Sequence, residues 1–356
     1  MENTMVPPLP IRPMNLQLQS SRRLRFLLLP LLALPLFASC FSNDGKPKEL
    51  SDEKKVGLYY ERAMRYYGMR ELDRCQDQVQ KGLELEPDNE RLLLMLGRCH
   101  QTRGTLQDVL MAEQIFRAHP AKKDYRVVLC LAGSLERKGT FFDEAANAVA
   151  SGDRFTEALD PQVRSEELKE DALDAWEEAY STYAEALVLY TGSFETLNGL
   201  MRTAVYLGRF EESLEWSTQF LESLAGSNDL FNKKLREQEL RGESSVDVEK
   251  TLLDNMDLET EIRLHRSELM YRDGKSREAL IELNEILAKD ETVAEVYARR
   301  GQILHILGEY QRSSDSLERF MSLSEDPFEH PNVRQAFTLI EKNKAALAIA
   351  RDTASQ

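Results

Sequence analysis

The sequence predicts an all-α protein: a solenoid of about seven to eight helical hairpins that ends in a C-terminal capping helix. From about Ser51 onward, apolar residues recur at helical spacing and no stretch alternates as a strand would. The segments around Gly274 and Gly308 resemble each other at a separation of 34 residues, which indicates repeated units that stack on their neighbours. Prolines after residue 50 fall only where a hairpin is expected to end, at Pro87, Pro120, Pro161, Pro327 and Pro331.

Residues 1–39 predict a signal peptide of the lipoprotein type. Three arginines precede an apolar run of 14 residues, Phe26–Ser39. A membrane-spanning helix needs about 20 apolar residues, and Pro30 and Pro35 interrupt this run, so we expect an export signal rather than a spanning helix. Four prolines lie ahead of the arginines, which leaves open whether translation begins at Met1 or Met14.

The end of this segment predicts a lipid anchor at Cys40. The sequence Phe37-Ala-Ser-Cys40 resembles the bacterial lipobox, although Phe37 stands where leucine is usual. That resemblance implies acylation of Cys40, which becomes the first mature residue, and acyl chains of this kind hold a protein stably on a membrane. Because Phe41 rather than aspartate follows, the resemblance favours the outer membrane, with the protein facing the periplasm. The alternative is a secreted chain without lipid.

Residues 40–50 are rich in turn formers and predict a flexible tether, and residues 51–351 predict the solenoid. Within the solenoid, residues 228–259 are irregular: a helical segment ends near Gly242, and we interpret the stretch as either a degenerate hairpin or an insertion. The apolar side chains of residues 332–351 predict the capping helix, through Phe337, Leu339, Ile340, Leu347 and Ile349.

The repeat resembles the tetratricopeptide repeat (TPR). In the unit 294–327, aromatic, small and apolar residues stand where that family places them, at Tyr297, Gly301, Leu304, Gly308, Tyr310 and Ser313. The units 56–89, 194–227 and 260–293 match well, whereas 90–124, 125–159 and 160–193 match less closely, with Gly139 and Phe141 at expected turn positions and Asp174 where a turn glycine is common.

This resemblance implies a right-handed superhelix in which the first helix of each pair lines a concave groove. Nine residues of this chain fall at groove positions and are our predicted partner-binding residues: Tyr60, Met64, Tyr67, Arg98, Asn198, Arg202, Tyr271, Gln302 and His305. Aromatic, Met and Arg side chains are suited to binding a peptide, although a tyrosine at helical spacing more often packs in a core.

The sequence predicts no catalysis, no cofactor and no metal site. Common catalytic motifs are missing, and Gly274-Lys-Ser276 lacks the earlier glycine of a phosphate loop. The five histidines have no ligand spacing. Cys75, Cys99 and Cys130 are expected to be buried thiols, with one disulfide left open if two Cα atoms lie within about 7 Å.

A net charge of -15 argues against nucleic acid as a partner. We therefore expect a lipid-anchored adaptor of the cell envelope that binds other proteins or peptides as part of a complex. Two alternatives stay open: a module that encloses a small ligand, and an enzyme whose site lies in the irregular stretch 228–259.

Overall fold

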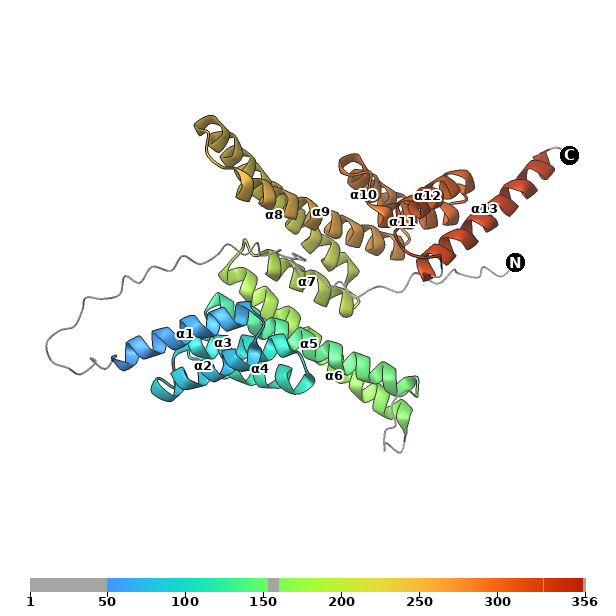
Figure 1. The fold of residues 1–356 in the computed structure, drawn as a ribbon. Helices are drawn as coiled ribbons and strands as arrows, with labels where there is room; N and C mark the ends of the chain where they lie inside the picture. Colours follow the sequence, from blue (N-terminus) through green and yellow to red (C-terminus); the bar gives the residue numbers. More distant parts are fainter. Residues whose placement is uncertain (1–49, 153–159, 329, 355–356) are drawn as a thin grey trace. The chain divides into compact units, whose positions relative to one another are not determined.

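The structure, a computed structural model, describes residues 50–152, 160–328 and 330–354. Across these ranges it has thirteen α-helices, packed as consecutive hairpins, and no strand, so the predicted all-α solenoid class is confirmed (Figure 1). None of the described helices is long and apolar enough to cross a bilayer. The predicted signal peptide, Cys40 and nearly all of the tether lie outside the described residues.

The chain divides into two compact units, residues 1–102 and 103–356. In unit 1, α1 (Asp52–Gly68) packs against α2 (Leu72–Leu85), and α3 (Glu90–Arg103) begins after a short turn. Acidic residues in the first turn of α1 face the positive end of that helix. The core of unit 1 consists of Val56, Ala63, Cys75, Val79, Leu92, Met95 and Cys99.

Unit 2 contains α4 (Leu106–Ala118) and four antiparallel pairs. These are α5 (Tyr125–Ala150) with α6 (Pro161–Leu189), α7 (Phe194–Tyr206) with α8 (Phe210–Arg241), α9 (Val246–Arg272) with α10 (Ser276–Lys289), and α11 (Ala294–Ile306) with α12 (Tyr310–Leu323). The last helix is α13 (Pro331–Ala354). Each pair packs on the next one along the chain, as a repeat array requires.

The turns between the two helices of a hairpin repeat one backbone conformation. Gly208, Gly274 and Gly308 follow α7, α9 and α11 with φ of 73°, 75° and 77°, the left-handed region that favours glycine. Arg70 has φ 60° at the corresponding turn between α1 and α2. The 34-residue spacing seen in the sequence is therefore a repeated backbone geometry, and in unit 1 a residue with a side chain adopts it.

The predicted hairpins 125–159 and 160–193 are wrong. Each stretch is mostly one continuous helix, α5 or α6, and the two helices together make one long hairpin. Thirteen described helices form at most six pairs, fewer than the seven to eight predicted. Gly139 lies inside α5, at a place where α6 approaches too closely for a side chain. A Cβ there would lie 2.5 Å from the Trp176 indole and 3.0 Å from the carbonyl oxygen of Ala172. This glycine serves packing and not a turn.

We expect Gly139→Ala to destabilise unit 2 by about 1–3 kcal/mol, because Trp176 is buried and stacked on Tyr206 and cannot move aside freely. Gly226→Ala in α8 is the matched control, since a Cβ there meets nothing within 4 Å, and it should stabilise by about 0.5–1 kcal/mol. Urea unfolding followed by tryptophan fluorescence measures both. Equal effects from the two substitutions would contradict the close approach.

The irregular stretch 228–259 is helical on both sides of a single turn. It consists of the lengthened C-terminal half of α8 and N-terminal half of α9, which join through a turn at Gly242 with φ 66°. The amide of Asn255 donates to Asn228 Oδ1 at 2.6 Å across the pair. The predicted helical segment and its break at Gly242 are confirmed.

The capping helix is confirmed, but two of its predicted contacts are wrong. Phe337 is 45% exposed and Ile349 is 65% exposed, so neither shields the last hairpin. The predicted contacts of Leu339 and Ile340 are confirmed: together with Val333 and Ala336 they pack against Ala298, Leu317 and Phe320.

Candidate functional site

The predicted groove residues of unit 1 form one surface, which we call the α1–α3 face: Tyr60, Met64, Tyr67 and Arg98. Residues 60, 64 and 67 follow one another at turn spacing along α1. Tyr60 and Tyr67 are half-buried and pack against the core, whereas Met64 is 43% exposed. The exposed Arg98 comes from α3, and its guanidinium carbon lies 5.2 Å from the centre of the Tyr67 ring.

Tyr67 is held in place from α3. The Tyr67 hydroxyl lies 2.9 Å from Thr102 Oγ1, and the Thr102 hydroxyl in turn donates to the carbonyl oxygen of Arg98 at 2.8 Å. A cation over an aromatic ring is stabilised by about 0.5–1 kcal/mol at an exposed site. The α1–α3 face thus presents a positioned positive charge on α3 and an exposed, flexible Met side chain on α1.

In unit 2, Arg202 of α7 is committed to an internal ion pair. Its Nε and Nη2 donate to Glu136 Oε1 and Oε2 of α5 at 2.6 and 2.7 Å. The hydroxyl of Tyr183, on α6, donates to Glu136 Oε2 at 2.7 Å. Burial raises the pKa of Tyr183 well above its ordinary value, with Glu136 adding to the effect, so this hydroxyl stays a donor. Glu136 of α5 therefore joins α6 and α7 to its own helix, and Arg202 is one of its two partners.

Asn198 lies one turn before Arg202 on α7, and its surroundings differ. Its Oδ1 is buried and accepts no hydrogen bond within the described residues.

Tyr271 of α9 is half-buried and packs against the cluster that contains Leu283 and Val296. Burial raises the pKa of Tyr271, and Glu268 acts in the same direction.

On α11, Gln302 and His305 are both half-buried. His305 Nδ1 lies 2.6 Å from Oδ1 of Asn343, a fully buried residue of α13 whose Nδ2 donates to Ser313 Oγ at 2.9 Å. Because the Asn343 nitrogen is a donor, its oxygen accepts from His305, which fixes the ring. The capping helix thus orients one of the predicted groove residues.

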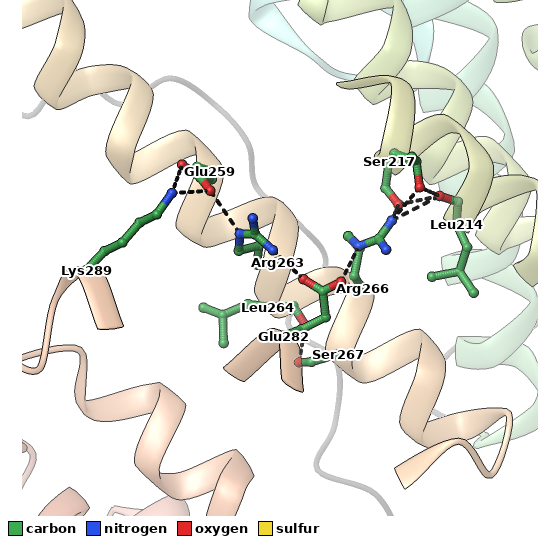
Figure 2. Close-up of polar contacts among 10 residues, drawn as sticks. Leu214, Ser217, Glu259, Arg263, Leu264, Arg266, Ser267, Glu282 and Lys289 are labelled. Carbon is green, nitrogen blue, oxygen red and sulfur yellow. Dashed lines mark hydrogen bonds and ion pairs between the residues drawn. The ribbon is translucent and has the colours of Figure 1, made fainter. Parts of the chain in front are cut away.

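A second polar cluster, which the sequence did not predict, joins α8, α9 and α10 (Figure 2). Glu259 Oε1 accepts from Lys289 Nζ at 2.6 Å and from Arg263 Nε at 2.9 Å. Arg263 and Arg266 then share Glu282, at 2.8 and 2.9 Å. We call these five residues the α9–α10 network.

The α9–α10 network ends on α8, where Arg266 donates to Ser217 Oγ, Thr218 Oγ1 and the carbonyl oxygen of Leu214. Burial opposes ionisation of Glu259, but hydrogen bonds from Lys289 and Arg263 outweigh it and lower its pKa. Every charge of the network has an opposite charge within hydrogen-bonding distance, so the network mainly fastens the α8/α9 and α9/α10 contacts.

A cavity of about 310 Å³ lies beside the α9–α10 network. Helix α8 contributes both apolar and polar side chains to its wall, and α9 and α10 contribute charged ones. The lining residues are Leu221, Leu224, Ala225, Asn228, Asp229, Glu259, Arg263 and Lys289. The cations in this wall already bind Glu259, so a ligand would have to compete with an internal partner.

His265 lies on α9, directly before Arg266 of the α9–α10 network. Its Nε2 lies 3.3 Å from the hydroxyl of Ser213, a fully buried residue of α8. Burial lowers the pKa of His265 to about 4, and positive charges act in the same direction, from Arg299, Arg272, Arg202 and Arg266. The described residues contain no group of three His, Cys, Asp or Glu side chains able to hold a metal ion.

No family model matches the chain, and no curated protein matches it. Among solved structures, a thermophilic TPR protein of Thermus thermophilus is 14% identical, with 71% of this chain and 99% of that chain covered and a TM-score of 0.39. A tetratricopeptide repeat protein of Parabacteroides merdae is 14% identical. The match covers 82% of this chain and 99% of that chain, with a TM-score of 0.33. Pseudomonas aeruginosa pilF is 11% identical. The match covers 80% of this chain and 98% of that chain, with a TM-score of 0.41. Identities and TM-scores this low carry no conclusion about function, and the fold class rests on the helices themselves.

Proposed function

We propose that this protein is an adaptor of the cell envelope. It binds a segment of another protein on the first helices of its hairpins, and a lipid on Cys40 holds it at a membrane, with the outer membrane as the favoured site. The α1–α3 face carries the binding part of this proposal, and the residues around Cys40 in the sequence support the anchoring part.

The α1–α3 face has the chemistry of a peptide-binding surface. Met64 offers an adaptable apolar contact, and the half-buried rings of Tyr60 and Tyr67 are rigid supports beside it. Arg98 is exposed and already aligned by Tyr67, so a carboxylate binds it without first ordering a free side chain. We therefore expect a bound segment that places an apolar side chain on Met64 and a carboxylate on Arg98.

The test is affinity capture from the native envelope, followed by a binding measurement with the partner it identifies. A Met64→Glu, Arg98→Glu double variant should weaken that binding at least tenfold, since it reverses the charge and removes the apolar contact. The matched control is Leu85→Glu, Arg74→Glu on α2: Leu85 is 40% exposed, and Arg74 likewise lies over a tyrosine ring, at 5.8 Å from Tyr66.

The control pair introduces the same change in net charge on the second helix of the hairpin, so it should leave the affinity within about twofold. Equal weakening by both pairs would show a nonspecific electrostatic effect. Unchanged binding with the Met64, Arg98 pair would remove the α1–α3 face from the proposal.

Mass spectrometry of the mature protein tests the anchor. Acyl chains on an N-terminal Cys40 support it, and a mature terminus elsewhere, or an unmodified Cys40, overturns it. The capture experiment is independent of this outcome.

The cavity beside the α9–α10 network supports a second candidate, a small polar ligand bound between α8 and α9. Its paired charges make this the less favoured function. A thermal shift with small metabolites that disappears in Leu224→Trp, a substitution that fills the cavity, would favour it.

A further inference from the structure

Two cysteines meet in the core of unit 1. Cys75 of α2 and Cys99 of α3 are both fully buried, and their Sγ atoms lie 2.8 Å apart. A disulfide has an S–S bond of about 2.0 Å, so the two sulfurs need to approach by less than about 1 Å to bond. We propose that Cys75 and Cys99 form a disulfide that joins α2 to α3.

The place of the pair in the repeat supports this proposal. Cys75 and Cys99 are 24 residues apart, and the residues at the same positions in a later repeat are Ala279 and Ile303. Both of these are buried in one cluster, at the contact between α10 and α11. Aliphatic side chains therefore satisfy the packing at this position, and packing alone does not require two thiols.

The oxidation needs an electron acceptor, and a low-molecular-weight disulfide such as glutathione disulfide is the chemical class that suffices. One cysteine thiolate attacks a sulfur of the acceptor, whose S–S bond breaks and releases one thiolate. The second cysteine thiolate then attacks the mixed disulfide, forms the Cys75–Cys99 bond and releases the second thiolate. The protein loses two protons and two electrons, and the acceptor becomes two thiols.

Burial sets when this reaction takes place. Neither Sγ atom is accessible in the folded unit, so the exchange has to precede the closing of α3 on α2, or use a local opening of the unit. After closure the same burial shields the bond from reductants. The crosslink also fixes α3 immediately beside Arg98, and so it rigidifies the α1–α3 face.

The test uses the full chain refolded from denaturant in a buffer of reduced and oxidised glutathione, so that access to the thiols is not limiting. After alkylation under denaturing conditions, proteolysis without reduction should yield one species in which the Cys75 and Cys99 peptides are joined. Cys130→Ser should yield the same species, because Cys130 lies in unit 2 and the proposal does not involve it.

Hydrogen exchange supplies a second readout in the same chain. Amides of residues 72–103 should exchange at least tenfold more slowly in the oxidised form than after reduction, because the crosslink restricts the opening of α3. Cys75→Ala, which places at this position the residue that Ala279 supplies in the later repeat, should show no difference between the two conditions. Alkylation of both Cys75 and Cys99 after refolding with the oxidant, or a bond from either of them to Cys130, would overturn the proposal.

Discussion

Replacing Glu136 by alanine is expected to lower the free energy of unfolding of unit 2 by about 3–5 kcal/mol. Glu136 as a residue is only 8% exposed, and its carboxylate accepts from Nε and Nη2 of Arg202. Without it, a largely buried guanidinium has no opposite charge, and the Tyr183 hydroxyl loses its acceptor as well. Both losses act on the contacts among α5, α6 and α7.

Tryptophan fluorescence during urea unfolding measures this effect, because the two tryptophans of the chain, Trp176 and Trp216, both lie in unit 2. Glu177→Ala is the matched control: its bond to Arg209 is as short, at 2.6 Å, but the Glu177 side chain is 54% exposed. It should cost less than about 1 kcal/mol.

A double variant, Glu136→Met with Arg202→Met, separates the charge from the packing. It leaves no uncompensated charge, so it should recover most of the stability that Glu136→Ala loses. A double variant as unstable as Glu136→Ala would show that shape, and not charge, dominates at this position.

Stability of unit 2 is expected to fall by about 3 kcal/mol as the pH drops from 6.5 to 4, through His265 alone. In the folded chain the pKa of His265 is about 4, against 6.5 for the unfolded side chain. Above pH 6.5 the ring is neutral in both states and contributes no pH dependence. Between these values the unfolded chain binds a proton that the folded chain excludes, and below pH 4 the contribution of His265 changes no further.

The measurement compares wild type with His265→Gln, whose side chain keeps a polar contact to Ser213 but does not titrate. Urea unfolding at several pH values should give two curves that run parallel above pH 6.5 and separate below it, with the wild type losing more. Because the carboxylates titrate in both proteins, the difference between the curves isolates His265. Parallel curves down to pH 4 would contradict the prediction.

The sequence was sufficient to predict the hairpins whose turns share one backbone geometry. Gly274 and Gly308 occupy left-handed turns, and the spacing between them predicted the turns between α9 and α10 and between α11 and α12, although not the start of α9 at Val246. The same reasoning placed Gly139 at a turn, which was wrong, because the sequence does not distinguish a glycine at a turn from a glycine under an indole ring. Only the approach of Trp176 from α6 distinguishes them, and the sequence does not contain that distance.

The polar contacts were harder to predict than the helices. Glu259 and Arg263 are four residues apart and belong to the α9–α10 network, yet Asp77 and Lys81 have the same spacing and form an exposed pair. Spacing on one helix does not reveal a third partner from another helix, such as Lys289. For the same reason Arg202 fitted the pattern of a binding residue, although Glu136, 66 positions earlier in the chain, already occupies its guanidinium.

The contacts between helices of unit 2 run almost entirely between elements that follow each other along the chain, from α4 on α5 to α12 on α13. Native contacts can therefore form over short loops, without a search for remote strands, so unit 2 should fold in microseconds to milliseconds per pair rather than in seconds. The same locality means that a growing chain can begin to fold while it is still being made, one hairpin at a time.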